Sequence, residues 1–176
     1  MKYLLCLIFV TILFLFPKTY VYAKSAYVLP YPSSMPGSSL YKVHLVWEEI
    51  SRYWYFGNFS QFKYNLSQAD KYLVESKTLF EYKQYLLGYQ ALKKSDRFFS
   101  TAPLYLQKAK QEGKNTDQKK KVLDQAALKH IEVLTSIQSI VPEHFVWEPE
   151  KDSPTELSLQ ESIQNSISTR SKWRQL

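Results

Sequence analysis

From position 40 onward, apolar residues recur every three or four residues, the spacing that gathers side chains on one face of an α-helix. Breaks in this pattern predict helices at about 40–56, 59–76, 79–112, 116–141 and 154–174. Short links favour antiparallel neighbours. The predicted fold class is therefore all-α: an antiparallel helical bundle of three long helices (about 59–76, 79–112 and 116–141) with flanking N- and C-terminal helices.

The predicted helix starts rest on pairs that match a capping box, in which an N-cap side chain and a Glu or Gln three residues later bond each other's backbone N–H. Four such pairs head periodic segments: Asn58 with Gln61, Thr78 with Glu81, Asn115 with Gln118, and Ser153 with Glu156. Gly57, Gly113 and Pro142 mark helix ends, since glycine and proline commonly end helices.

The predicted first helix has one strongly apolar stripe, which we expect to face the core. It comprises Leu40, Val43, Trp47, Ile50 and Trp54. A polar, proline-rich stretch over residues 24–39 precedes this helix and predicts an extended lead-in, because proline disfavours helix around it.

The longest predicted helix carries a seam of alternating large and small residues. The large residues are Tyr85, Leu92, Phe99 and Leu106, and the small ones are Gly88, Ser95, Ala102 and Ala109. Such a seam predicts close approach of a neighbouring helix. Pro103 predicts a kink near residues 99–101, since proline cannot donate the backbone hydrogen bond of a helix interior.

The N-terminus has the pattern of a signal peptide. Lys2 precedes an apolar run at 3–16, and small residues at the −3 and −1 positions predict cleavage between Ala23 and Lys24. The run is too short for a typical transmembrane helix, although an uncleaved N-terminal anchor is an open alternative. The predicted organisation is a signal peptide at 1–23, the lead-in at 24–39 and a helical-bundle domain at 40–176. The predicted location is extracytoplasmic, either secreted or associated with the cell envelope.

Cleavage would change the composition in two ways. It would remove Cys6, the chain's one cysteine, and it would leave 21 of the 23 Lys and Arg against 16 Asp and Glu. The mature chain could then form no disulfide and no thiolate metal site. Its net positive charge could attract an anionic envelope polymer or lipid surface, but lysines scattered among glutamates are also typical of a solvated helix surface.

The sequence carries no recognisable catalytic or cofactor motif. It has neither a nucleophile elbow nor a glycine-rich phosphate loop. His130 falls on the inner side of its helix, as expected of a hydrogen-bonded core histidine, and His144 lies near several glutamates in a weak candidate for metal ligation. No catalytic, cofactor-binding or metal site is predicted. A hydrolase with a scattered carboxylate site, as paired glutamates such as Glu48 and Glu49 could supply, is a remote alternative.

Four consecutive aromatic residues, Tyr53, Trp54, Tyr55 and Phe56, form the end of the predicted first helix. A helix buries only part of its circumference, so they cannot all face one core. Trp54 is expected to face inward, with Tyr53 or Tyr55 at the edge. These residues are the candidate partner contact, unless the next helix or the lead-in covers them.

The segments 27–32, 35–38 and 40–41, followed later by Ala127–Leu134 and by Val141-Pro142-Glu143, resemble a family of exported bacterial helical proteins, domain of unknown function 5667. The resemblance covers roughly residues 27–174. It implies an exported helical protein with no assigned activity. Pro103 and the acidic, proline-containing link at 147–154 depart from the family pattern.

These observations favour an exported, non-enzymatic interaction or structural module that binds an unknown protein or envelope partner. The alternative is a basic binder of an anionic envelope polymer or lipid surface. We expect no nucleic-acid partner, and membrane contact only through the signal peptide or a weak surface interaction. Salt dependence separates these two hypotheses, because charge-driven binding weakens as ionic strength rises.

Overall fold

The computed structural model describes residues 25–32, 39–151 and 153–174 of the chain. The predicted cleavage site at Ala23 and Lys24 lies outside them. The described elements are α2 (Ser39–Arg52), α3 (Asn58–Glu81), α4 (Tyr85–Gln111), α5 (Asp117–Gln138), β1 (His144–Trp147), β2 (Thr155–Ser158) and α6 (Leu159–Arg174).

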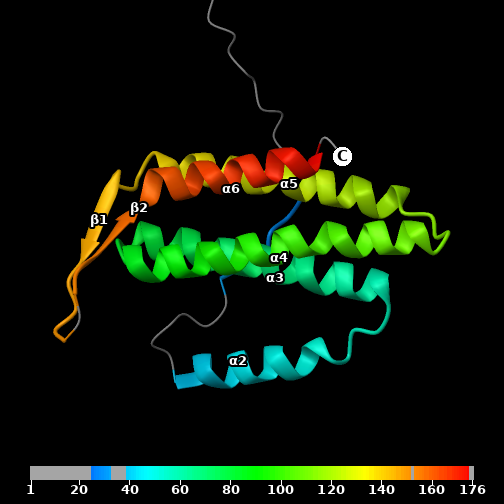
Figure 1. Ribbon diagram of the computed structural model, residues 1–176, viewed down its shortest axis with the longest axis horizontal. Coiled ribbons are helices and arrows are strands. Elements are labelled where there is room, and N and C mark those ends of the chain that lie inside the picture. Colours follow the sequence, from blue (N-terminus) through cyan, green and yellow to red (C-terminus); the bar gives the residue numbers. More distant parts are fainter. Residues whose placement is uncertain (1–24, 33–38, 152, 175–176) are drawn as a thin grey trace, which may run out of the picture.

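Helices α3, α4, α5 and α6 pack as an antiparallel bundle, and α2 lies along one side of it (Figure 1). The predicted all-α class is confirmed. The helix α6 is a fourth member of the bundle rather than a flank, because Leu159, Ile163 and Arg170 on its inner side are fully buried. None of the described helices is long and apolar enough to cross a membrane.

The boundary between α3 and α4 lies later than predicted. Thr78 is not an N-cap: it lies inside α3, and its hydroxyl donates to the carbonyl of Val74 at 3.0 Å. The chain turns instead at Lys83, whose φ of 59° is left-handed, and Gln84 N donates to the carbonyl of Leu79 at 2.8 Å. The turn that ends α3 therefore has a lysine in the left-handed conformation that glycine usually adopts. No glycine in the sequence marks this helix end.

The predicted helix at 154–174 begins too early. Residues 144–147 and 155–158 form an antiparallel hairpin in which Phe145 pairs with Leu157 and Val146 pairs with Glu156. Glu156 is therefore a strand residue, so the capping box with Ser153 is wrong. Leu157 is buried and Phe145 packs against the same core cluster. The hairpin thus closes one end of the bundle, and each strand is too short for its alternation to stand out in the sequence.

The helices α3 and α5 begin within two residues of the predicted starts, but not through capping boxes. Gly57 precedes α3, and Asn58 instead donates to the carboxylate of Glu112 at 2.6 Å. Asn115 Oδ1 accepts from the backbone N–H of Asp117 at 2.9 Å, outside a reciprocal pair. The helix α2 ends at Arg52 rather than at 56, and α5 ends at Gln138 rather than at 141.

The seam predicted on the longest helix is confirmed. Its small residues are all buried, and α4 packs more extensively on α3 than on any other described element. Ser76 donates to the carbonyl of Gly88 and Ser95 donates to the carbonyl of Ala69, both at 2.8 Å, so the two backbones lie close together. Helix α4 is one element through Pro103, 27 residues and about 40 Å long.

The bundle has two apolar core clusters. One cluster lies beside the hairpin and is built around Leu73, Phe80, Leu92, Leu134, Ile137 and Ile163. The other cluster lies towards the α4–α5 turn and is built around Phe62, Leu66, Phe99, Leu106 and Leu123. Along each helix, polar side chains occupy the positions between the two clusters.

Candidate functional site

Helix α2 turns its apolar stripe away from the bundle. Val43, Val46, Trp47 and Ile50 are all exposed, and with Lys42 they line a shallow hollow of about 350 Å³. The predicted inward orientation of Val43, Trp47 and Ile50 is therefore wrong. Exposed apolar side chains that adjoin one another are typical of interaction sites.

Glu48 accounts for this orientation. It lies about 140° around the helix from Val43, and its carboxylate pairs with Lys71 and accepts from the Tyr72 hydroxyl at 2.8 Å. Tyr64 donates to the Glu48 backbone carbonyl at 3.1 Å. The helix α2 thus docks by its polar side. The side chains of Lys71 and Glu48 are only 19% and 16% exposed, so this ion pair is partly withdrawn from water, and burial lowers the pKa of Lys71.

The predicted contact residues continue the same surface. Tyr53, Trp54 and Phe56 are 70%, 62% and 81% exposed, so the inward placement of Trp54 is also wrong. Tyr55 instead packs on Tyr64 of α3, with ring centroids 5.0 Å apart. The rings of Trp47 and Trp54 meet edge to face at 5.4 Å. We call Val43, Val46, Trp47, Ile50, Tyr53, Trp54 and Phe56 the outer face of α2.

A buried polar layer separates the two core clusters. Arg170 of α6 is fully buried and donates to Asp96 Oδ1 at 2.6 Å, to Ser95 Oγ at 2.9 Å and to His130 Nδ1 at 3.1 Å. His130 Nε2 lies 2.7 Å from Asp70 Oδ1. The layer therefore joins all four bundle helices through hydrogen-bonded charges, as buried ionic groups require.

The layer fixes the tautomer of His130. Because Arg170 can only donate, Nδ1 of the ring must accept, and the ring proton lies on Nε2 facing Asp70. Burial is the main cause that lowers the pKa of His130, and the positive charge of Arg170 adds to it. The prediction that His130 is a hydrogen-bonded core histidine is confirmed.

The segment 25–32 is tied to this layer. The Tyr27 hydroxyl donates to Asp70 Oδ2 at 2.6 Å, and Ser25 Oγ donates to the carbonyl of Gln125 at 2.8 Å. Burial and the neighbouring Asp70 charge raise the pKa of Tyr27 far above its ordinary value. Both carboxylate oxygens of Asp70 are therefore occupied, one by Tyr27 and the other by His130.

The structure brings together little of the other predicted chemistry. His144 lies beside Glu156 and Glu143, at 3.2 and 3.7 Å, on an exposed strand. Among the described residues, no group of three or more His, Asp or Glu side chains could hold a metal ion. Glu48, one of the paired glutamates of the remote hydrolase alternative, binds Lys71 and Tyr72 through its carboxylate.

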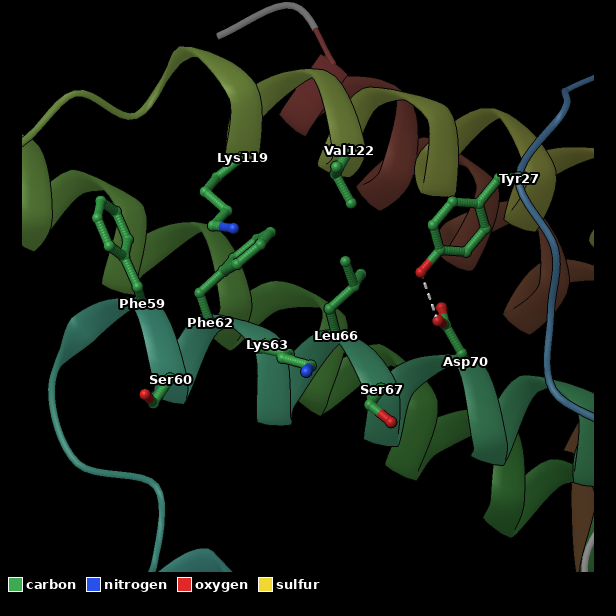
Figure 2. Close-up of a pocket in the computed structure, with 10 residues that line it drawn as sticks. All are labelled: Tyr27, Phe59, Ser60, Phe62, Lys63, Leu66, Ser67, Asp70, Lys119 and Val122. Atoms are coloured by element: carbon green, nitrogen blue, oxygen red, sulfur yellow. Dashed lines mark hydrogen bonds between the residues drawn. The ribbon is translucent and has the colours of Figure 1, made fainter.

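A groove of about 550 Å³ opens between α3 and α5, with Tyr27 at one end (Figure 2). Its lining residues are Tyr27, Phe59, Ser60, Phe62, Lys63, Leu66, Ser67, Asp70, Lys119 and Val122. Lys63 extends from α3 and Lys119 from α5, on opposite walls. Within the part of the chain that the structure describes, neither ammonium group forms an ion pair.

Sequence reasoning missed the groove and most of the polar layer. A signal for the layer was present: Leu159, Ile163, Ser166 and Arg170 recur at intervals of four, three and four, which places the arginine on an inner seam. Ser95 and His130 also occupy inner positions. The groove left no such signal, because its two lysines are far apart in sequence.

One protein family matches the chain. The match spans residues 33–144, from just before α2 to the first residue of β1, and is narrower than the resemblance expected over 27–174. No curated protein and no solved structure matches significantly. The matched segment includes α2, α3, α4 and α5 and excludes Arg170. Because it covers more than half of the sequence, the chain belongs to the family described as a domain of unknown function, DUF5667.

Proposed function

We propose that this protein is an exported, non-enzymatic interaction module that binds a protein partner through the outer face of α2. The observation that carries the proposal is the orientation of α2, which Glu48 holds with its charged side on the bundle and its apolar side exposed. Exposing two tryptophans and three aliphatic side chains costs free energy unless a partner covers them.

The composition of this face favours a protein partner. Trp and Tyr are the residues most enriched among those that dominate binding energy in protein interfaces. The seven side chains of the outer face are uncharged, and Lys42 is the one charged residue among those that line the adjoining hollow. Docking on it therefore depends on apolar burial, which ionic strength weakens far less than it weakens charge pairing.

Site-specific photo-cross-linking in cells of the native host tests the proposal. A cross-linking residue at Ile50 is expected to capture a discrete protein, and the capture should persist when salt is raised. The same residue at Lys110, exposed on α4, is the matched control. Equal capture from both positions, or no capture from Ile50, would contradict the proposal.

A second variant separates binding from folding. Trp47→Ser combined with Trp54→Ser should abolish the cross-link from Ile50 while leaving thermal unfolding within a few degrees of the wild type, because both side chains are already exposed. An unchanged cross-link in this variant would show that the outer face does not carry binding.

The exported location is a separate part of the proposal and rests on the N-terminal pattern. Intact-mass measurement of the protein from its host should give a chain that begins at Lys24. A mass that includes Met1 would contradict cleavage and leave the alternative of an uncleaved anchor.

A further inference from the structure

We propose that the groove between α3 and α5 binds a small amphiphile that has a single carboxylate on an elongated apolar body, such as a medium-chain fatty acid. The groove lies away from the outer face of α2, and the inference does not depend on the proposed function.

The floor of the groove is apolar and elongated. Phe59, Phe62 and Leu66 follow one another at intervals of three and four along α3, so they form a strip about 10 Å long on one side of that helix. Val122 of α5 lies opposite (Figure 2). A strip of this kind fits a linear or flat apolar body better than a compact one.

The two lysines give the groove its charge preference. Lys63 and Lys119 reach it from opposite walls, and each lacks an ion-pair partner among the described residues. Two unpaired ammonium groups beside an apolar strip favour a ligand that carries a negative group on an apolar body.

The far end of the groove favours a ligand with only one negative group. Asp70 lies there, and its oxygens already accept hydrogen bonds from Tyr27 and His130. A second anionic group at this end would meet the Asp70 carboxylate without a donor to bind it. The Tyr27 ring instead offers an apolar stop. The ligand is therefore anionic at one end and apolar at the other.

Titration calorimetry tests the proposal on the protein purified from its host, with decanoate as the probe and neutral decanol as the matched control. We expect decanoate to bind saturably and about tenfold more tightly than decanol, the contribution expected of two partly exposed ion pairs. Lys63→Gln combined with Lys119→Gln should remove that difference by weakening decanoate alone.

Two further variants define the site. Lys121→Gln removes a neighbouring lysine that is exposed on the same helix but does not line the groove, and it should leave decanoate binding unchanged. Val122→Trp should fill the groove and abolish binding of both probes. The lysine variants alter surface residues, so they remain informative even if Val122→Trp unfolds. Absence of saturable decanoate binding, or unchanged affinity in the double lysine variant, would overturn the proposal.

Discussion

The guanidinium of Arg170 donates its Nε–H to Nδ1 of His130 at 3.1 Å, and both side chains are fully buried. This hydrogen bond joins α6 to α5 in the middle of the bundle. The same guanidinium also donates to Asp96 and Ser95. Arg170 therefore supplies most of the hydrogen bonds that hold the polar groups of this layer.

Replacing Arg170 with methionine should therefore destabilise the fold strongly. The change removes the donor to Asp96 Oδ1 and to Ser95 Oγ, while Ser166 still donates to Asp96 Oδ2. Breaking a buried ion pair by removing one partner costs about 3–5 kcal/mol, and we expect the lower end of that range because the Asp96 side chain is 23% exposed. Urea unfolding measures the effect. Arg174→Met, on an exposed residue of the same helix, is the control and should change the free energy of unfolding by less than about 0.5 kcal/mol. Equal losses in the two variants would show that the layer does not stabilise the bundle.

Stability should fall as the pH drops through about 6.5, the ordinary pKa of histidine. The lowered pKa of His130 keeps its ring neutral in the folded chain, whereas the unfolded chain protonates it. The unfolded state then binds more protons, so acid favours unfolding, by at most about 1.4 kcal/mol per pH unit for one group. Urea unfolding at several pH values measures this slope. His144→Gln, which changes an exposed histidine, should retain the slope, and His130→Gln should lose it.

Tyr27→Phe should destabilise the chain by about 1–3 kcal/mol, because it leaves an oxygen of buried Asp70 without its donor. Tyr31→Phe removes the same hydroxyl from a residue that is 94% exposed and should have no measurable effect. Thermal unfolding of the pair tests whether the segment 25–32 is part of the cooperative fold. Identical midpoints would contradict that view.

Gly88→Ala should destabilise the chain even though alanine is the better helix former by about 1 kcal/mol. A Cβ at this position would lie 2.8 Å from Cδ1 of Phe80, and overpacking of this kind costs about 1–3 kcal/mol. Phe80→Leu in the Gly88→Ala background should recover part of the loss. A stabilised single variant would show that the Phe80 ring can shift aside at little cost.

Glu48→Gln should loosen α2 without unfolding the bundle, because the variant loses the ion pair with Lys71. Hydrogen exchange of the α2 amides is expected to accelerate while exchange in α4 stays unchanged. Glu81→Gln breaks an exposed pair with Lys77 and serves as the control. If exchange in α2 is unaffected, another contact orients this helix.

The apolar spacing was enough to predict the long helices and the small-residue seam of α4. It could not predict that α2 faces outward, because an exposed interaction stripe and a buried core stripe have the same period. What decides the orientation is Glu48, whose partners Lys71 and Tyr72 lie over twenty residues away. The groove could not be predicted for a similar reason. Lys63 and Lys119 are far apart in sequence and line the same groove only because α3 packs against α5.

The polar layer also has a consequence for how the helices find their alignment. Apolar seams rich in leucine and alanine tolerate a slip of one heptad, because similar side chains still meet. If α6 docked one heptad away, Ile163 would take the place of Arg170 and leave Asp96 without its cation, a loss of several kcal/mol. We therefore expect the layer to disfavour misaligned packing of the helices during folding.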